Sequence, residues 1–173
     1  MDVTEMTSTL VIVIFLFVAV IQDLRSLKVS NRLILIGMCV AVPIQIWESG
    51  VGKIVWILPN IIIPVIVLYL FYLSRILGAA DIKLFSMVGC YLNLRELIYS
   101  IIAAFIVGAI LALFKMIICG NFISRISAGA CYIKELAVGN VRAYEECDDS
   151  SLIHFSIAIL FGVLLVKVYL SIT

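Results

Sequence analysis

The sequence predicts an all-α, polytopic membrane protein of about six transmembrane helices with a short fourth segment. Of its 173 residues, 65% are hydrophobic and only 13% are charged, whereas soluble domains usually carry about 25% charge. The apolar residues gather into six runs, and about 20 such residues cross a bilayer. The length fits a single membrane-embedded domain over residues 1–173. A net charge of +1 argues against a nucleic-acid-binding protein, which would need a basic surface.

The six segments are separated by polar breaks. They cover about Met6–Gln22, Leu33–Trp47, Ile54–Leu73, Ile82–Leu92, Leu97–Cys119 and Leu152–Ile172. The second contains Pro43, which we expect to kink its helix. The third contains Pro59 and Pro64 around Asn60, and we expect Asn60 to form an interhelical hydrogen bond. The fourth is too short to span the bilayer, which favours a half-embedded helix buried against protein.

The one sizeable polar stretch covers residues 120–151. In its first half apolar residues such as Phe122 and Ile126 interleave with charged ones such as Arg125 and Lys134, a pattern typical of an amphipathic helix lying on a membrane surface. Its acidic end, EECDD, is expected to be a solvated loop. We therefore predict a cytoplasmic loop that is partly amphipathic helix.

The cysteines give no sign of a metal site or of a cofactor. None of the five forms a C-x-x-C pair, which a zinc site would favour, and their odd number predicts no disulfide framework. Several fall within or beside apolar runs, where a cysteine usually serves as a small apolar residue. The cysteines are Cys39, Cys90, Cys119, Cys131 and Cys147.

The positive-inside rule predicts the orientation of the chain. With the N-terminus outside and six crossings, most basic residues fall on the cytoplasmic side: Arg25, Lys28, Arg32, Arg75, Lys83, Arg125, Lys134 and Arg142. The outer side then holds Lys53, Arg95 and Lys167. This predicts a multi-pass protein of the cytoplasmic (inner) membrane with Asp23 and Asp81 at its cytoplasmic face. If the fourth segment re-enters instead of crossing, the last two segments are inverted.

Asp23 and Asp81 stand at the ends of apolar runs, and an ionisable group at membrane depth is by default a functional candidate. Two neighbouring carboxylates cannot both ionise cheaply, so such a pair shares one proton. The ionised member can accept a proton from water while the protonated member donates to a carbonyl, as in aspartic proteases. This chemistry needs no metal. The alternative is a pair of helix-end charges, with Asp81 at a helix dipole and Asp23 paired with Arg25 or Lys28.

The sequences around the two aspartates, DLRSLKVSN and GAADIKLF, resemble the two motifs of the type IV prepilin peptidase family: D-x-R with a downstream I-P-N, and G-x-G-D-x-K. The resemblance extends over most of the chain, including the six-segment hydropathy and the final HFSIAILFG. The length is similar to that of the small, peptidase-only members that serve Flp-type or Tad pili. The resemblance implies that Asp23 and Asp81 are the catalytic residues of an aspartic endopeptidase.

The resemblance also implies a substrate and further site residues. The substrate would be a prepilin or pseudopilin, cleaved at the cytoplasmic face just before its hydrophobic helix. Four motif positions are candidates for positioning: Arg25, Asn31, Gly78 and Lys83. Arg25 and Lys83 can also be membrane-side anchors, Asn31 a plain turn residue and Gly78 a helix terminator. The chain departs from the motifs at Ser30, which replaces a proline and can cap the second helix, and at Ala80, which replaces a glycine.

Two other functions fit the same residues. A proton- or cation-coupled transporter could use the two carboxylates as a relay, although no acidic residues continue towards the other face. A non-catalytic membrane subunit of a pilus-assembly complex is the second alternative. His154, the single histidine, is expected at the membrane interface more than as a general base. The sequence leaves the oligomeric state open.

Overall fold

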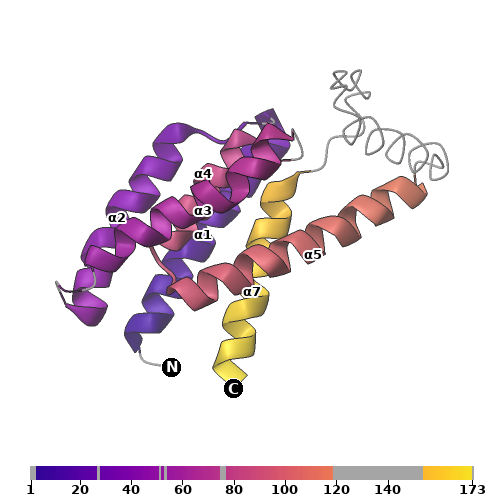
Figure 1. Cartoon of the computed structure of the whole chain (residues 1–173). Helices are drawn as coiled ribbons and strands as arrows, with labels where there is room; N and C mark the ends of the chain where they lie inside the picture. Colours follow the sequence, from indigo (N-terminus) through magenta and orange to yellow (C-terminus); the bar gives the residue numbers. More distant parts are fainter. Residues whose placement is uncertain are drawn as a thin grey trace. The chain divides into compact units, whose positions relative to one another are not determined.

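The computed structural model describes residues 3–26, 28–50, 52, 54–74, 77–118 and 154–172. Within these ranges the secondary structure is helical, with no strand, which confirms the all-α prediction. The helices are α1 (Val3–Ser26), α2 (Asn31–Ser49), α3 (Ile54–Leu73), α4 (Ala79–Gly89), α5 (Leu94–Ile118) and α7 (Phe155–Ile172), as Figure 1 shows. The amphipathic helix predicted within 120–151 falls outside the described residues.

Five of these helices have the composition of membrane segments. Three are long and apolar enough to cross a membrane, over Met6–Ser26, Leu94–Lys115 and Phe155–Ile172. Two shorter apolar stretches are Asn31–Trp47 and Ile57–Leu73. The protein is therefore a polytopic membrane protein, as the sequence predicts. The remaining helix, α4, has 11 residues and is not a spanning segment.

The chain divides into two compact units. One comprises Met1–Val107 and His154–Thr173, and the other comprises Gly108–Ile153. The first contains α1 to α4, the beginning of α5 and α7, and every residue discussed below belongs to it. Within this unit α1 packs against α2 and α7, and α4 packs along α3 while also contacting α2 and α7.

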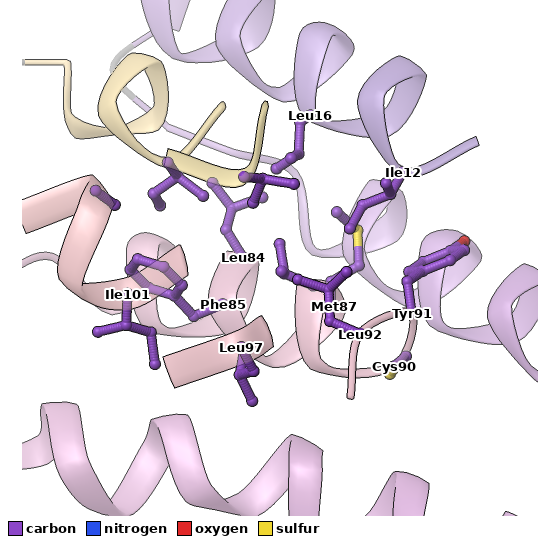
Figure 2. Close-up of a cluster of buried hydrophobic side chains, with 14 of the residues drawn as sticks. Ile12, Leu16, Leu84, Phe85, Met87, Cys90, Tyr91, Leu92, Leu97 and Ile101 are labelled. Atoms are coloured by element: carbon purple, nitrogen blue, oxygen red, sulfur yellow. The ribbon is translucent and has the colours of Figure 1, made fainter. Parts of the chain in front are cut away.

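Helix α4 lies at the centre of the hydrophobic core. All residues from Ile82 to Gly89 except Lys83 are buried. Figure 2 shows Leu84 and Met87 of α4 beside Ile12 and Leu16 of α1. A short helix of this kind gains little from its own propensity, so most of its stability comes from tertiary packing. The fourth segment is thus buried against protein, as expected from its length.

Polar side chains from two neighbouring helices form hydrogen bonds to the backbone just after the C-terminal end of α4. The amide Nδ2 of Asn60 in α3 donates to the carbonyl of Leu92 at 2.9 Å. Nε2 of Gln45 in α2 donates to the carbonyl of Tyr91 at 3.0 Å. The Tyr91 hydroxyl in turn donates to the carbonyl of Gly37 at 2.7 Å. These bonds satisfy buried carbonyls of the turn that follows α4. The Asn60 bond therefore joins α3 to the connection between α4 and α5 and not directly to another helix.

Two glycines allow close helix contacts in this unit. A Cβ atom on Gly89 of α4 would collide with the backbone carbonyl of Asn60 in α3. A Cβ atom on Gly162 of α7 would lie 2.7 Å from the backbone nitrogen of Ala104 in α5. Small residues let helix backbones approach in this way in membrane proteins. The approach at Gly89 brings α3 near enough for Asn60 to reach the end of α4.

Candidate active site

Asp23 lies in the last turn of α1, inside the helix. The apolar run predicts that the segment closes at Gln22, but α1 continues to Ser26, because a polar turn can extend a helix beyond its apolar part. The Asp23 side chain is 16% exposed. The hydroxyl of Ser156 in α7 donates to its Oδ2 at 2.6 Å. Nδ1 of His154, the residue just before α7, lies 3.4 Å from the same oxygen.

Asp81 lies in the first turn of α4, where its side chain caps the helix. The backbone N–H of Gly78 donates to Asp81 Oδ2 at 3.2 Å. Gly78 is the N-cap residue and has an extended conformation, with φ −78° and ψ 151°, so its backbone does not require a glycine. A Cβ atom on Gly78 would, however, lie 3.2 Å from Asp81 Oδ2. Glycine at this position therefore leaves room for the carboxylate.

The two carboxylates lie within electrostatic reach of each other. Burial raises the pKa of Asp81 from 3.8 to about 6. The hydrogen bond from the Gly78 backbone acts in the opposite direction, and the negative charge of Asp23 raises the pKa of Asp81 further. The charge of Asp23, 58 positions away in the sequence, thus acts on the protonation of Asp81, as expected of two carboxyl groups that lie near each other.

A second contact joins the two motif segments. Nζ of Lys83 in α4 donates to Oδ1 of Asn31, the first residue of α2, at 2.9 Å. Both side chains are exposed. Since Lys83 follows Asp81 by two residues, the bond ties the start of α2 to the helix end that carries Asp81. Arg25, in contrast, is exposed, and among the described residues no ion pair or hydrogen bond links its side chain to either aspartate.

The two departures from the family motifs are accommodated in the backbone. Ser30 is the N-cap of α2, where its hydroxyl accepts the Arg32 N–H at 3.2 Å; this confirms the predicted cap. The Ser30 N–H donates to Oε1 of Gln22 at 3.0 Å, a bond that proline cannot form. Ala80 lies within α4, so its backbone is right-handed helical and alanine carries no strain there.

Sequence reasoning missed two residues whose side chains contact the motif segments. Ser156 is hidden in the apolar stretch HFSIAILFG, and Gln22 ends an apolar run without any motif around it. His154, which the sequence places at the membrane interface, lies with Nδ1 3.4 Å from Asp23 Oδ2, a contact that the sequence does not predict. The only available signal was the position of His154 and Ser156 at the start of the last segment, on the predicted cytoplasmic side. Among the described residues, no group of three His, Cys, Asp or Glu side chains could hold a metal ion.

The site leaves part of each carboxylate available for chemistry. Oδ2 of Asp23 is held by Ser156, and Oδ2 of Asp81 is held by Gly78. Among the described residues, no hydrogen bond reaches Oδ1 of either aspartate. The arrangement can therefore support paired general acid and general base catalysis by two carboxyl groups with different protonation.

Comparison with known proteins identifies a family. Residues 10–113 match the model of the type IV leader peptidase family, which covers more than half of the chain and includes both motif segments. A search of curated proteins finds no match, and no solved structure matches. The match over residues 10–113 shows that the chain belongs to the type IV leader peptidase family.

Proposed function

From its membership of the type IV leader peptidase family, we propose that this protein is a membrane-embedded aspartic endopeptidase. It removes the leader peptide from type IV prepilin or pseudopilin substrates at the cytoplasmic face of the inner membrane. The observation that supports this best is the coupling of the two carboxyl groups, since the charge of Asp23 contributes to the raised pKa of Asp81. Aspartic proteases depend on such a pair, in which one group is ionised and the other protonated.

The reaction requires one water molecule and no covalent intermediate. The ionised carboxylate takes a proton from water, whose oxygen attacks the carbonyl carbon of the scissile peptide bond. The protonated carboxyl group donates to the carbonyl oxygen, giving a tetrahedral intermediate. Its collapse breaks the C–N bond, and a proton passes to the leaving amine. The oxygens of Asp23 and Asp81 that are not held by hydrogen bonds are suited to these transfers.

The position of the pair suits a substrate that is itself embedded in the membrane. Asp23 lies at the end of a membrane-length helix, Met6–Ser26, and Asp81 begins the buried helix α4. An apolar substrate helix can therefore remain in the bilayer while the bond before it reaches the two carboxyl groups. A basic leader would lie on the cytoplasmic side, in keeping with the positive-inside rule.

The test is cleavage of a Flp-type prepilin, with a basic leader and an apolar N-terminal helix, by the purified full chain in liposomes. We expect the wild-type protein to shorten the prepilin, as seen by intact mass. Asp23→Asn and Asp81→Asn should each lower the rate by about 10³-fold or more, because each removes one proton-transfer group. Glu96→Gln is the matched control. Glu96 pairs with Lys167 at 3.0 Å in another part of the unit, so its cleavage rate should stay within about threefold of wild type.

Other outcomes would contradict the proposal. Retained cleavage in either aspartate variant would exclude a catalytic pair. Ion flux through the same liposomes, abolished by both substitutions and without prepilin cleavage, would favour a transporter. A prepilin that is bound but left intact by the wild-type protein would favour a non-catalytic assembly subunit.

A further inference from the structure

The two carboxyl groups accept hydrogen bonds from different kinds of donor. Oδ2 of Asp23 receives the Ser156 hydroxyl at 2.6 Å and faces His154 Nδ1 at 3.4 Å. Oδ2 of Asp81 receives a single backbone N–H, from Gly78 at 3.2 Å. A short hydrogen bond to a carboxylate is charge-assisted, so it favours the ionised form. Nothing of this kind reaches Asp81 from a side chain among the described residues.

We infer that Ser156 and His154 are positioning residues that hold Asp23 ionised, so that Asp23 is the general base and Asp81 the general acid. This assignment rests on the proposed function, in which the two aspartates form the catalytic pair. It divides between them the two roles that their sequence motifs leave open.

The geometry around Asp23 supports the assignment. Ser156 is buried, with 1% of its surface exposed, and it is fixed in the first turn of α7. The short bond to Asp23 therefore fixes the orientation of the carboxylate through its Oδ2 atom. His154 Nδ1 is buried and forms no hydrogen bond within the described part of the chain. Its distance of 3.4 Å from Asp23 is that of an ion pair, available when the imidazole is protonated.

The surroundings of Asp23 contain few competing charges. Within the described ranges, the titratable groups that act on it or on which it acts are His154, before α7, and Asp81, from α4. Lys83, also on α4, is bonded to Asn31. Among the described residues of α2, no charged side chain pairs with Asp23. The ionised state of Asp23 is thus supported from α7 and opposed by the charge of Asp81. When Asp81 is protonated it carries no charge and no longer repels the Asp23 carboxylate. An ionised base at Asp23 and a protonated acid at Asp81 therefore favour each other.

The first test is the dependence of prepilin cleavage on pH, measured as kcat/KM with the same liposomes. The active pair carries one proton, so its rate falls on the acid side when the second carboxyl is protonated and on the alkaline side when both are ionised. Ser156→Ala removes a donor to Asp23 and raises the tendency of Asp23 to bind a proton. If Asp23 is the base, we expect the acid limb to move up by about one pH unit and the alkaline limb to stay in place.

The limb of the pH profile that moves distinguishes Asp23 as the base from Asp23 as the acid. If Asp23 were the acid, Ser156→Ala would move the alkaline limb and leave the acid limb in place, which overturns the inference. A merely structural role would lower the rate equally at every pH, and that result also overturns it. Ser156→Thr retains the hydroxyl and should restore the wild-type profile. Ser171→Ala is the matched control, because the exposed Ser171 of α7 donates to the Val168 carbonyl of its own helix and has no bond to Asp23 or Asp81 among the described residues.

A second measurement does not depend on activity. Carboxyl ¹³C labelling of aspartate in the full chain gives five resonances, from Asp2, Asp23, Asp81, Asp148 and Asp149. Spectra of Asp23→Asn and Asp81→Asn assign the two signals of the pair. We expect Asp23 to titrate at lower pH than Asp81, and its titration to move up in both Ser156→Ala and His154→Gln.

The two measurements separate the inference from the function on which it rests. Titration of Asp81 below Asp23, or an unchanged Asp23 titration in both variants, overturns the inference even if the prepilin is cleaved. Cleavage that survives in Asp23→Asn overturns the proposed function, whatever the order of titration.

Discussion

The two ends of α4 handle buried polar groups in opposite ways. At the C-terminal end, neutral amides of Asn60 and Gln45 satisfy the carbonyls of Leu92 and Tyr91, and each group has its partner. At the N-terminal end, Asp81 is an ionisable group whose pKa is raised by burial to about 6, beside another carboxylate. One end is built for stability. The other holds two acids, and burial of one of them opposes its ionised form, as is common at functional sites.

The difference follows from the charge of the groups involved. A buried amide that is hydrogen-bonded costs little, since it replaces water without carrying charge. A buried carboxylate must either find a cation or bind a proton. Among the described residues, no cation is paired with Asp81, and Lys83, two positions away, is bonded to Asn31. Substitutions at the two ends should therefore have different consequences.

The largest stability effect is expected at the C-terminal end. Asn60→Leu leaves the Leu92 carbonyl without its donor in a buried position, which should lower the free energy of unfolding by about 1–3 kcal/mol. Prepilin cleavage per folded molecule should change little. Thermal unfolding in detergent measures the first effect. Ser171→Ala, at an exposed serine near the end of α7, is the control and should leave stability within about 0.5 kcal/mol. Equal loss in both variants would contradict the role of the Asn60 bond.

At the N-terminal end, a substitution should increase stability when the pH is high. The folded protein holds the Asp81 proton more tightly than the unfolded chain, because its pKa rises from 3.8 to about 6. The stability that Asp81 contributes is thus fully present below about pH 4 and is lost as the pH rises through 6. Asp81→Asn cannot ionise and avoids this loss. A pKa shift of this size corresponds to at most about 3 kcal/mol of stability lost at high pH. Because Asp81 is partly solvated, we expect the loss to be on the order of 1 kcal/mol.

The measurement is the thermal midpoint of both proteins between pH 4 and pH 8. The midpoint of Asp81→Asn should exceed that of the wild type by a margin that grows with pH, to about 2–4 °C. Ser171→Ala should follow the wild-type curve at every pH. Parallel curves for the wild type and Asp81→Asn would show that burial of Asp81 costs nothing.

The smallest effect is expected at the exposed contact between α2 and α4. Lys83→Met removes the donor to Asn31 and keeps an apolar stem of similar length. An exposed bond of this type contributes about 0.5–1 kcal/mol to stability, so the free energy of unfolding should fall by no more than that. Cleavage should fall by about two- to fivefold, since the start of α2 is no longer tied to the helix end that carries Asp81. The double variant with Asn31→Ala should lose no more than either single variant. Lys28→Met, at an exposed lysine of the α1–α2 loop, is the control. Additive losses would show that the two residues act independently.

The sequence predicts the fold well because apolar runs report directly on membrane helices. The predicted third segment coincides with α3, Ile54–Leu73, and the predicted short fourth segment corresponds to α4. The helix ends are less well predicted, since α1 continues four residues beyond Gln22. Polar residues such as Asp23 interrupt the hydropathy pattern without interrupting backbone hydrogen bonds, so hydropathy alone ends the segment too early.

The sequence also predicts candidate site residues, but only those that lie in motifs. Asp23, Asp81, Asn31 and Lys83 are found in this way, and the structure joins them in two pairs. Arg25, the other charged motif residue, makes no such contact among the described residues. Ser156 lies 133 positions from its partner Asp23. A serine within an apolar helix carries no local pattern, so its partner becomes visible only when α7 is packed against α1.

By itself, the sequence determined that this protein consists of membrane helices and that two acidic residues lie at the ends of apolar segments, where desolvation makes an ionised group unfavourable. Both facts are local, because hydropathy and desolvation depend on the residues of one segment. Only the tertiary structure decided that α4 is buried at the centre and that Gln45 and Asn60 meet the carbonyls of Tyr91 and Leu92 just after it. It also decided that the start of α7 brings a serine and a histidine to Asp23. These contacts join residues distant in sequence, and packing of the helices, rather than any local preference, selects them.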